Sequence, residues 1–351
     1  MHLSIIGSPG CGKTTLFRAF SGVVKEGGST GSTVAIIEVP DDRLEKLSSI
    51  FKPKKTVHGR IEIVDTASIH EGDMKNETVP AKQLQEMRLS DAFLLVLRNF
   101  DNGSTPDPVG DFHTILTEFV IADMVQIETR LDRIKKQGGK RDGAALDQER
   151  VLLEQCYAYL ETGKPLSNLA LAEGDWKSLR GFQFLSQKPL MAVVNCSEDK
   201  VKDTENIAKE VSAKLDNAFP VVAVCGSLEA ELVMMEPEDQ AVFMAEYGLS
   251  ESLRGRLIHL AYQTLGLISF LTVGEDECRA WPIRKGICAQ DAAAVIHTDL
   301  SDKFIRAETV GYDDFVCHGD FPACKKAGVW RLEGKTYVVK DGDIICIRAG
   351  N

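Results

Sequence analysis

Residues 7–14 read GSPGCGKT, and they follow directly after an apolar run at residues 3–6. The spacing G-x-x-x-x-G-K-T between a buried strand and a helix is typical of a phosphate-binding P-loop, in which backbone N–H groups surround the phosphates. Glycine at residues 7 and 12 permits close approaches that a Cβ atom would block. The stretch therefore predicts a strand, a glycine-rich turn and a helix that begins at Lys13, and together these predict a nucleotide site.

Lys13 and Thr14 supply the charge and the hydroxyl that such a site needs. The Lys13 ammonium is expected to meet the β- and γ-phosphates as the catalytic lysine, and the Thr14 hydroxyl is expected to join the shell of a Mg²⁺ ion. The alternative is a glycine turn with only a structural role. From this stretch we expect these residues to contact the nucleotide: Gly7, Gly10, Cys11, Gly12, Lys13, Thr14 and Thr15.

Cys11 lies between two glycines, beside Lys13 and a helix N-terminus. A positive environment favours the thiolate, so we expect the pKa of Cys11 to lie below that of a free cysteine, with redox sensitivity as the consequence. A small buried residue explains Cys11 equally well, and that interpretation stays open.

The 351-residue chain carries a formal net charge of −11, with 44 % hydrophobic residues. This acidity excludes bulk electrostatic attraction to nucleic acid or anionic membranes, so any such contact needs a local basic patch. No apolar run approaches the length of a membrane span, and the P-loop lies where the apolar core of a signal peptide would end. Nine cysteines without C-x-x-C spacing fit reduced thiols. We therefore expect a cytoplasmic protein that does not contact a membrane.

Apolar strand-like runs alternate with helical stretches along the chain, which predicts an α/β fold with a mostly parallel sheet covered by helices. The expected strands are residues 3–6, 34–39, 61–64, 92–97, 190–194 and 221–224. A helical segment at 111–184 interrupts them, and it begins with a coiled-coil-like seam of apolar residues at 120, 124, 127, 131 and 134. A turn at Gly138-Gly139 precedes a second helix, so an antiparallel hairpin is expected, with these residues on its inner face: Leu146, Leu153, Cys156 and Leu160.

Residues 133–141, at the expected tip of this hairpin, include five basic and no acidic side chains. One interpretation is an ordinary solvated turn, and the other is a contact with the phosphate backbone of an RNA. The basic residues are Arg133, Lys135, Lys136, Lys140 and Arg141.

From about residue 270 the chain changes to short β-like runs separated by turn signals, which predicts a small β-rich domain. The expected strands there are 293–297, 336–339 and 344–347. The predicted organisation is therefore a discontinuous nucleotide domain at 1–110 and 185–268, a helical insertion at 111–184 and a C-terminal domain at 269–351.

Two further segments have the spacing of nucleotide motifs. Asp65 ends the strand at 61–64, where a carboxylate is expected to hold Mg²⁺, and Ser68 follows in place of the glycine of D-x-x-G. Ser68 can offer a backbone N–H to the γ-phosphate, but it lacks the conformational freedom of glycine.

After the strand at 190–194, residues 195–198 read NCSE at the position of the base-reading motif N-K-x-D. Glu198 is one methylene longer than the aspartate that accepts two hydrogen bonds from guanine, and Cys196 cannot replace the lysine stem. Because a strict guanine reader leaves its carboxylate unpaired against adenine, a displaced Glu198 favours ATP or poor discrimination. We expect the base to contact Asn195, Glu198, Cys225, Gly226 and Ser227, although 225–227 could be a plain strand-end turn.

Over nearly its full length the chain resembles the Obg-like, YchF-type P-loop NTPases of the translation-factor class. The resemblance is carried by the P-loop, PDDRL at 40–44, NCSE, CGSLEAEL at 225–232, RAW at 279–281, AAAVIHTD at 292–299, FIRAE at 304–308 and WRLEGK at 330–335. It implies a β-grasp TGS domain at the C-terminus, of the kind shared with threonyl-tRNA synthetases, together with hydrolysis of ATP in preference to GTP and association with ribosomes.

Departures from this family fall in the expected site. Gly10 stands where the family usually has an asparagine that can help to hold a monovalent cation, and Asp107 stands where a loop histidine is linked to hydrolysis. Ile69 occupies the place of a water-orienting glutamine, which leaves His70 as the nearest catalytic candidate beside a solvated-loop interpretation. Thr30 or Thr33 could sense the γ-phosphate and its Mg²⁺.

Three functions remain open from the sequence. The first is a slow ATPase whose nucleotide state controls attachment to a ribosome or RNA. The second is a nucleotide-gated binding module of the GTPase type with negligible hydrolysis. The third is a structural adaptor that has lost the nucleotide, which the intact Lys13 and Thr14 argue against.

Overall fold

The computed structural model describes residues 2–22, 33–137, 143–247 and 253–350. The chain forms two compact units, one from Met1–Ala35 and Glu62–Arg256, and the other from Ile36–Ile61 and Leu257–Asn351. Among the described residues no helix is long and apolar enough to cross a membrane.

A six-stranded sheet, mostly parallel and in the order β2-β4-β1-β5-β6-β7, forms the centre of the first unit, although residues 36–39 of β2 and 59–61 of β4 are grouped with the second unit. This confirms the α/β fold expected from the alternating apolar runs. The first unit has a fully buried core on one face of the sheet, where Phe93 of β5 packs against Phe119 of the helix α4 (Pro108–Gln137). The strands are β1 (His2–Gly7), β2 (Thr33–Val39), β4 (Gly59–Asp65), β5 (Ala92–Asn99), β6 (Leu190–Cys196) and β7 (Val221–Val224).

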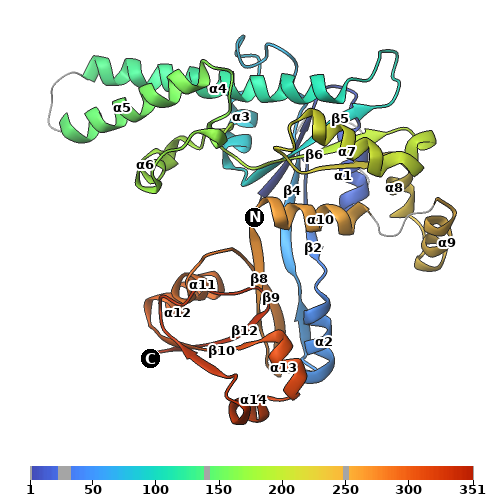
Figure 1. Cartoon of the computed structure of the whole chain (residues 1–351), viewed down its shortest axis with the longest axis vertical. Coiled ribbons are helices and arrows are strands. Elements are labelled where there is room, and N and C mark those ends of the chain that lie inside the picture. The colour runs from blue at the N-terminus through green and yellow to red at the C-terminus, as the bar shows by residue number, and fades with distance from the viewer. Residues whose placement is uncertain (1, 23–32, 138–142, 248–252, 351) are drawn as a thin grey trace. The chain divides into compact units, whose positions relative to one another are not determined.

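Helices flank this sheet (Figure 1). Short 3-10 turns lie at Leu166–Asn168, at Arg180–Phe182 and at Glu198–Asp203 (η3). The helices are α1 (Lys13–Ser21), α3 (Ala81–Leu89), α4 (Pro108–Gln137), α5 (Gly143–Leu160), α6 (Glu173–Leu179), α7 (Thr204–Lys214), α8 (Gly226–Leu232), α9 (Pro237–Tyr247) and α10 (Leu253–Thr264), whose last residues belong to the second unit. Of these, α5, α6 and α9 lie farther from the sheet (Figure 1).

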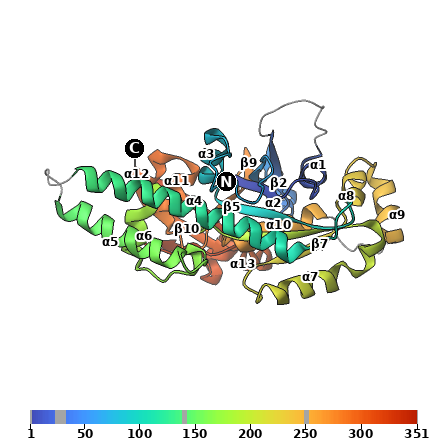
Figure 2. The ribbon, with the colours of Figure 1, turned by 90° about the horizontal axis from the view of Figure 1, so that it is seen from above.

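The helical hairpin consists of α4 and α5, which run side by side (Figure 2). The expected seam is correct, because Val120 and Ile127 are buried between the two helices, and Met124, Leu131 and Ile134 pack against the same cluster. A bidentate ion pair adds to this packing: Arg130 donates to both carboxylate oxygens of Glu149 at 2.6 and 2.8 Å. Of the basic tip, Lys140 and Arg141 lie outside the described residues.

The second unit contains a sheet in the order β11-β10-β12-β8-β9-β3. Its strands are β3 (Lys55–Val57), β8 (Leu267–Thr272), β9 (Glu277–Arg284), β10 (Phe304–Gly311), β11 (Arg331–Glu333) and β12 (Asp343–Ala349). Its helices are α2 (Asp42–Phe51), α11 (Ala289–Ile296), α12 (Thr298–Asp302), α13 (Tyr312–His318) and α14 (Phe321–Ala327).

Two of the strands predicted in this unit are not formed. Residues 293–297 lie mainly in helix α11, because Ala289, Ala292 and Ala293 recur at helical spacing and pack into the core. Residues 336–339 form only an isolated bridge, between Val338 and Cys288. The third expected strand, at 344–347, is correct and lies within β12.

The two units divide the chain differently from the boundaries expected from the sequence. The segment Ile36–Ile61 groups with the C-terminal residues. Leu44 and Leu47 of α2 are buried in one cluster with Phe315, and β3 pairs with β9 in parallel. The three-part domain organisation stays a prediction.

Candidate functional site

The P-loop has the backbone that its glycines require. Gly10 and Gly12 have φ angles of 71° and 92°, a region that side-chain-bearing residues rarely adopt. Gly7 has no room for a side chain, because a Cβ atom there would lie 2.7 Å from the carbonyl oxygen of Val96 on β5. The loop therefore packs directly on the sheet and leads into α1 at Lys13.

The Lys13 side chain is only 8 % exposed and lies back across this loop. Its Nζ donates to the carbonyl oxygen of Gly7 at 3.3 Å and to the hydroxyl Oγ of Ser68 at 2.6 Å. The ammonium thus joins the P-loop to the segment that follows β4, which is where a phosphate-sensing residue is expected.

Thr14 and Asp65, the expected Mg²⁺ ligands, lie together at the ends of α1 and β4. The Thr14 hydroxyl donates to Oδ2 of Asp65 at 3.4 Å, and Asp65 is 5 % exposed. Within the described ranges no group of three or more His, Cys, Asp or Glu could hold a metal ion. A hydroxyl beside one carboxylate fits a Mg²⁺ ion that takes its other ligands from phosphate and water. Thr33 begins β2, and Thr30 lies outside the described residues.

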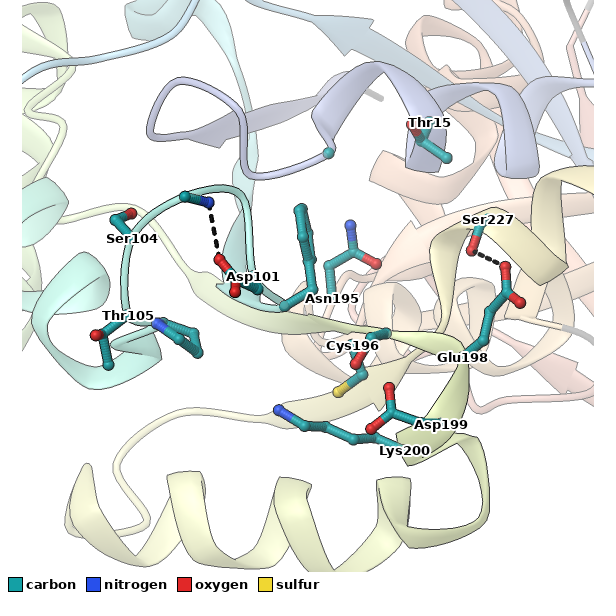
Figure 3. Close-up of a pocket in the computed structure, with 15 residues that line it drawn as sticks. Thr15, Asp101, Ser104, Thr105, Asn195, Cys196, Glu198, Asp199, Lys200 and Ser227 are labelled. Atoms are coloured by element: carbon teal, nitrogen blue, oxygen red, sulfur yellow. Dashed lines mark hydrogen bonds between the residues drawn. The ribbon is translucent and has the colours of Figure 1, made fainter.

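Asn195 connects the P-loop to the expected base-reading segments. Its Nδ2 donates to the carbonyl oxygen of Cys11 at 3.0 Å, and its Oδ1 accepts from the backbone N–H of Gly226 at 3.0 Å. Glu198 begins η3, and one of its carboxylate oxygens accepts from the Ser227 hydroxyl at 3.4 Å (Figure 3). The residues singled out around N-K-x-D in the sequence are therefore brought together.

A cavity of about 1000 Å³ opens beside these residues (Figure 3). Gly12 and Thr15 line it from the P-loop side, residues 195–200 and Ser227 line it from the base-reading side, and much of the loop 100–106 forms a further wall. Its size suits a nucleotide.

Sequence reasoning missed the loop 100–106 and also Asp199 and Lys200. The sequence did contain a signal for this loop. Ligands of α/β proteins bind at the carboxyl ends of the parallel strands, and β5 ends at Asn99, just before the loop. Nζ of Lys200 donates to the backbone oxygen of Asn99 at 3.1 Å and to its side-chain oxygen at 3.2 Å. Lys200 also lines the cavity, so a lysine is present there although Cys196 stands in place of the lysine of the N-K-x-D motif.

The expectation of a reactive Cys11 is wrong. Cys11 is 1 % exposed, and burial raises the pKa of its thiol above the ordinary value even though the charge of Lys13 acts in the opposite direction. Desolvation of the thiolate outweighs the field of the loop. Cys11 is a small packed residue within the P-loop.

Two other sequence candidates lie in surroundings that suggest structural roles. The His70 ring is 64 % exposed, and its Nδ1 lies 3.3 Å from Oδ2 of Asp73 in the same loop. The Thr78 hydroxyl, 2.6 Å from Asp73, holds the pKa of that carboxyl below its usual range. Asp107 caps α4, since its Oδ1 accepts from the backbone N–H of Gly110 at 2.9 Å.

Comparison with known proteins adds two family matches. Residues 2–130 match a family model described as a 50S ribosome-binding GTPase, and residues 267–350 match a model of the C-terminal part of YchF GTPases, described as a protein of unknown function.

Similar proteins cover almost the whole chain. The "Ribosome-binding ATPase YchF" of Bacillus subtilis is 38 % identical over 358 residues, with 98 % of each chain covered. The protein of the same name from Escherichia coli O157:H7 is 34 % identical, with 97 % of each chain covered. The solved structure of the Schizosaccharomyces pombe YchF GTPase matches with a TM-score of 0.83 at 26 % identity, covering 99 % of this chain and 97 % of the other.

Proposed function

Because this chain belongs to the YchF family, we propose that it is a slow, Mg²⁺-dependent ATPase whose nucleotide state controls its association with the ribosome. Membership rests on relatives that match it from end to end and on the family models at both ends of the chain. It is a P-loop NTP hydrolase. The observation that carries the proposal is the cavity bounded by both the P-loop and the segment 195–200.

The phosphate end of this site supports nucleotide binding. Lys13 supplies a buried positive charge, and Thr14 with Asp65 supplies a hydroxyl and a carboxylate within 3.4 Å of each other. When bound, Mg²⁺ would neutralise charge on the phosphate oxygens. Thr14 and Asp65 would hold it on the protein side, and the backbone N–H groups of the P-loop would orient the phosphates.

The base end supports ATP over GTP. Glu198 is longer than the aspartate of a guanine reader, and its carboxylate already accepts a hydrogen bond from Ser227. Adenine has no 2-amino group to donate a hydrogen bond to a carboxylate. A carboxylate without another partner would therefore be left unpaired against adenine, whereas Glu198 keeps its hydrogen bond from Ser227, so binding of ATP is penalised less.

The catalytic end supports slow turnover. Ile69, at the place of a water-orienting side chain, is 1 % exposed and packs in the core. His70, the next residue along the chain, would be the side chain that orients water, although its ring is 64 % exposed and its Nδ1 lies 3.3 Å from Oδ2 of Asp73. A multiple-turnover phosphate-release assay with Mg-ATP tests the proposed slow hydrolysis. We expect the wild type to release phosphate slowly and Lys13→Ala to release none.

The surroundings of Ile69 and His70 also favour a second candidate function, binding of a nucleotide without hydrolysis. If neither Ile69 nor His70 orients water, the protein is a nucleotide-gated binding module with negligible hydrolysis. Tight Mg-ATP binding without phosphate release would identify this alternative.

The hairpin supports a ribosomal partner. The α4 helix ends in Arg133, Lys135 and Lys136, and its far end points away from α1 in both views (Figures 1 and 2). Relatives named as ribosome-binding span the same length. A basic tip can meet RNA phosphates while the acidic body of the protein stays apart from them.

A further inference from the structure

The loop between β5 and α4 forms one wall of the nucleotide cavity without regular secondary structure. It contributes Phe100, Asp101, Gly103, Ser104, Thr105 and Pro106 to the lining. Gly103 has a φ of 98°, so the loop turns sharply at this point. A wall of this kind keeps its shape only if its backbone groups have fixed partners.

Arg98, on β5, provides those partners. Its Nη1 donates to the backbone oxygens of Phe100 at 2.7 Å and Ser104 at 2.9 Å. Its Nη2 donates to the Ser104 hydroxyl at 3.0 Å and to the backbone oxygen of Thr105 at 3.1 Å. One guanidinium thus satisfies four acceptors, all in the loop that lines the cavity.

The loop also has bonds of its own, but these do not attach it to the sheet. Oδ1 of Asp101 accepts from the backbone N–H of Gly103 at 2.8 Å, and the Ser104 hydroxyl donates to Oδ1 of Asn102 at 3.0 Å. Both bonds join residues within the loop. Arg98, in contrast, is fixed in β5 in register with Asn195 of β6, so it connects the loop to the strand ends that carry the site.

Arg98 is buried, and its backbone is also held in place. The residue is 9 % exposed, and Oδ2 of Asp111 accepts from its backbone N–H at 3.3 Å. A planar guanidinium with donors in a fixed fork can serve several carbonyl oxygens at once, whereas an ammonium acts as a point charge.

We propose that Arg98 is a positioning residue that holds the loop 100–106 as a preformed wall of the nucleotide cavity. The inference rests on the proposed function of this cavity as the nucleotide site. Without Arg98 the loop loses the four hydrogen bonds that it accepts from the guanidinium. The loop must then become ordered when the nucleotide binds, and this ordering lowers the affinity. Lys13, Thr14 and Asp65 are not among the partners of the Arg98 side chain, so the phosphate end keeps its contacts.

The test measures the dissociation constants of Mg-ATP and Mg-ADP by calorimetry for the wild type, Arg98→Met and Arg98→Lys. We expect Arg98→Met to weaken both nucleotides by about tenfold or more, and Arg98→Lys to recover only part of the loss. If the wild type turns over ATP, KM should rise more than kcat falls, because the loss lies in the binding wall.

A matched control separates this role from general loss of stability. Arg88 is also largely buried, and its Nη1 lies 3.4 Å from Oδ1 of the fully buried Asp123, away from the cavity lining. Arg88→Met should lower the melting temperature but leave nucleotide affinity within about twofold. In Arg98→Ala, added methylguanidinium should restore affinity, which a simple folding defect would not allow.

The outcomes distinguish this inference from the function on which it rests. A wild type that binds Mg-ATP together with an Arg98→Met variant that binds equally well contradicts the role of Arg98 alone. Equal losses in Arg88→Met and Arg98→Met, or no rescue by methylguanidinium, contradict it as well. A wild type that binds no nucleotide contradicts both the site and the positioning role.

Discussion

Nζ of Lys13 donates a hydrogen bond of 2.6 Å to the hydroxyl of Ser68. This contact joins the P-loop to the first residues after β4, and the same segment continues into a loop held by the hairpin. There, Gly72 and Met74 donate their backbone N–H groups to the carboxylate of Glu118 on α4, at 2.7 and 2.8 Å. A nucleotide phosphate that pairs with Lys13 would take this lysine away from Ser68. The segment that begins at Ser68 would then lose a contact with the P-loop while it stays attached to α4 through Glu118.

The carboxylate of Glu118 is expected to be important for stability. It is 2 % exposed and accepts two backbone N–H groups, so Glu118→Gln places an amide donor against one of them. We predict a loss of about 2 kcal/mol in the free energy of unfolding, measured by urea denaturation. Glu154→Gln, which breaks an exposed pair with Arg150, is the control and should change it by less than about 1 kcal/mol. Equal stabilities of the wild type and Glu118→Gln would contradict this account of the loop.

Base choice should respond to the last residue of β6, Cys196, and to Glu198, which follows it. Glu198→Asp combined with Cys196→Lys restores the carboxylate length and the lysine stem of a guanine reader. We predict a shift in the ratio of dissociation constants toward GTP, because the shorter carboxylate can pair with guanine N1–H and the 2-amino group. Competition of GTP against ATP measures the shift. An unchanged ratio in the double variant would show that base choice lies outside 195–198.

Cys11 should resist alkylation in the folded protein. Burial raises the pKa of its thiol, so less of the reactive thiolate is present at a given pH than in an unburied cysteine, and the residue is also only 1 % exposed. Exposed Cys317 is the internal control. Mass spectrometry after brief treatment with iodoacetamide should find Cys317 modified and Cys11 unmodified until denaturant is added. Equal labelling of the two would restore the original expectation of a reactive Cys11.

Ribosome association should depend on the basic tip of the hairpin. Reversal to Glu at Arg133, Lys135, Lys136, Lys140 and Arg141 should abolish salt-sensitive co-sedimentation with ribosomes while Mg-ATP binding stays intact, because the tip is separate from the P-loop. A smaller charge reversal at Lys209 and Lys214, two exposed lysines on α7, is the control and should leave sedimentation unchanged. If the tip variant sediments as well as the wild type, the tip is an ordinary solvated turn.

Features encoded in short contiguous stretches could be predicted from the sequence. The P-loop needs only eight residues in order, and the hairpin seam needs only the spacing of apolar residues along one helix. The prediction of a reactive Cys11 is wrong because the pKa of its thiol depends on burial, which the neighbouring Lys13 does not reveal. The prediction of a strand at residues 293–297 is wrong because a short apolar run fits either a strand or a helix.

Features that depend on tertiary contacts could not be predicted. Arg98 follows an apolar run and has no motif of its own, and its role appears only when the loop 100–106 folds back over its guanidinium. The grouping of Ile36–Ile61 with the C-terminal unit likewise depends on the packing of α2 with Phe315, far away in the sequence.

Calorimetric titration of Mg-ATP and Mg-GTP into the wild type and Lys13→Ala tests the central claim most directly. We predict that the wild type binds ATP at least as tightly as GTP. We also predict that Lys13→Ala loses about 3 kcal/mol of nucleotide binding, because a buried charge that meets the β- and γ-phosphates is removed. Equal binding of Mg-ATP by the two proteins, or nanomolar GTP binding by the wild type with no detectable ATP binding, would contradict the account.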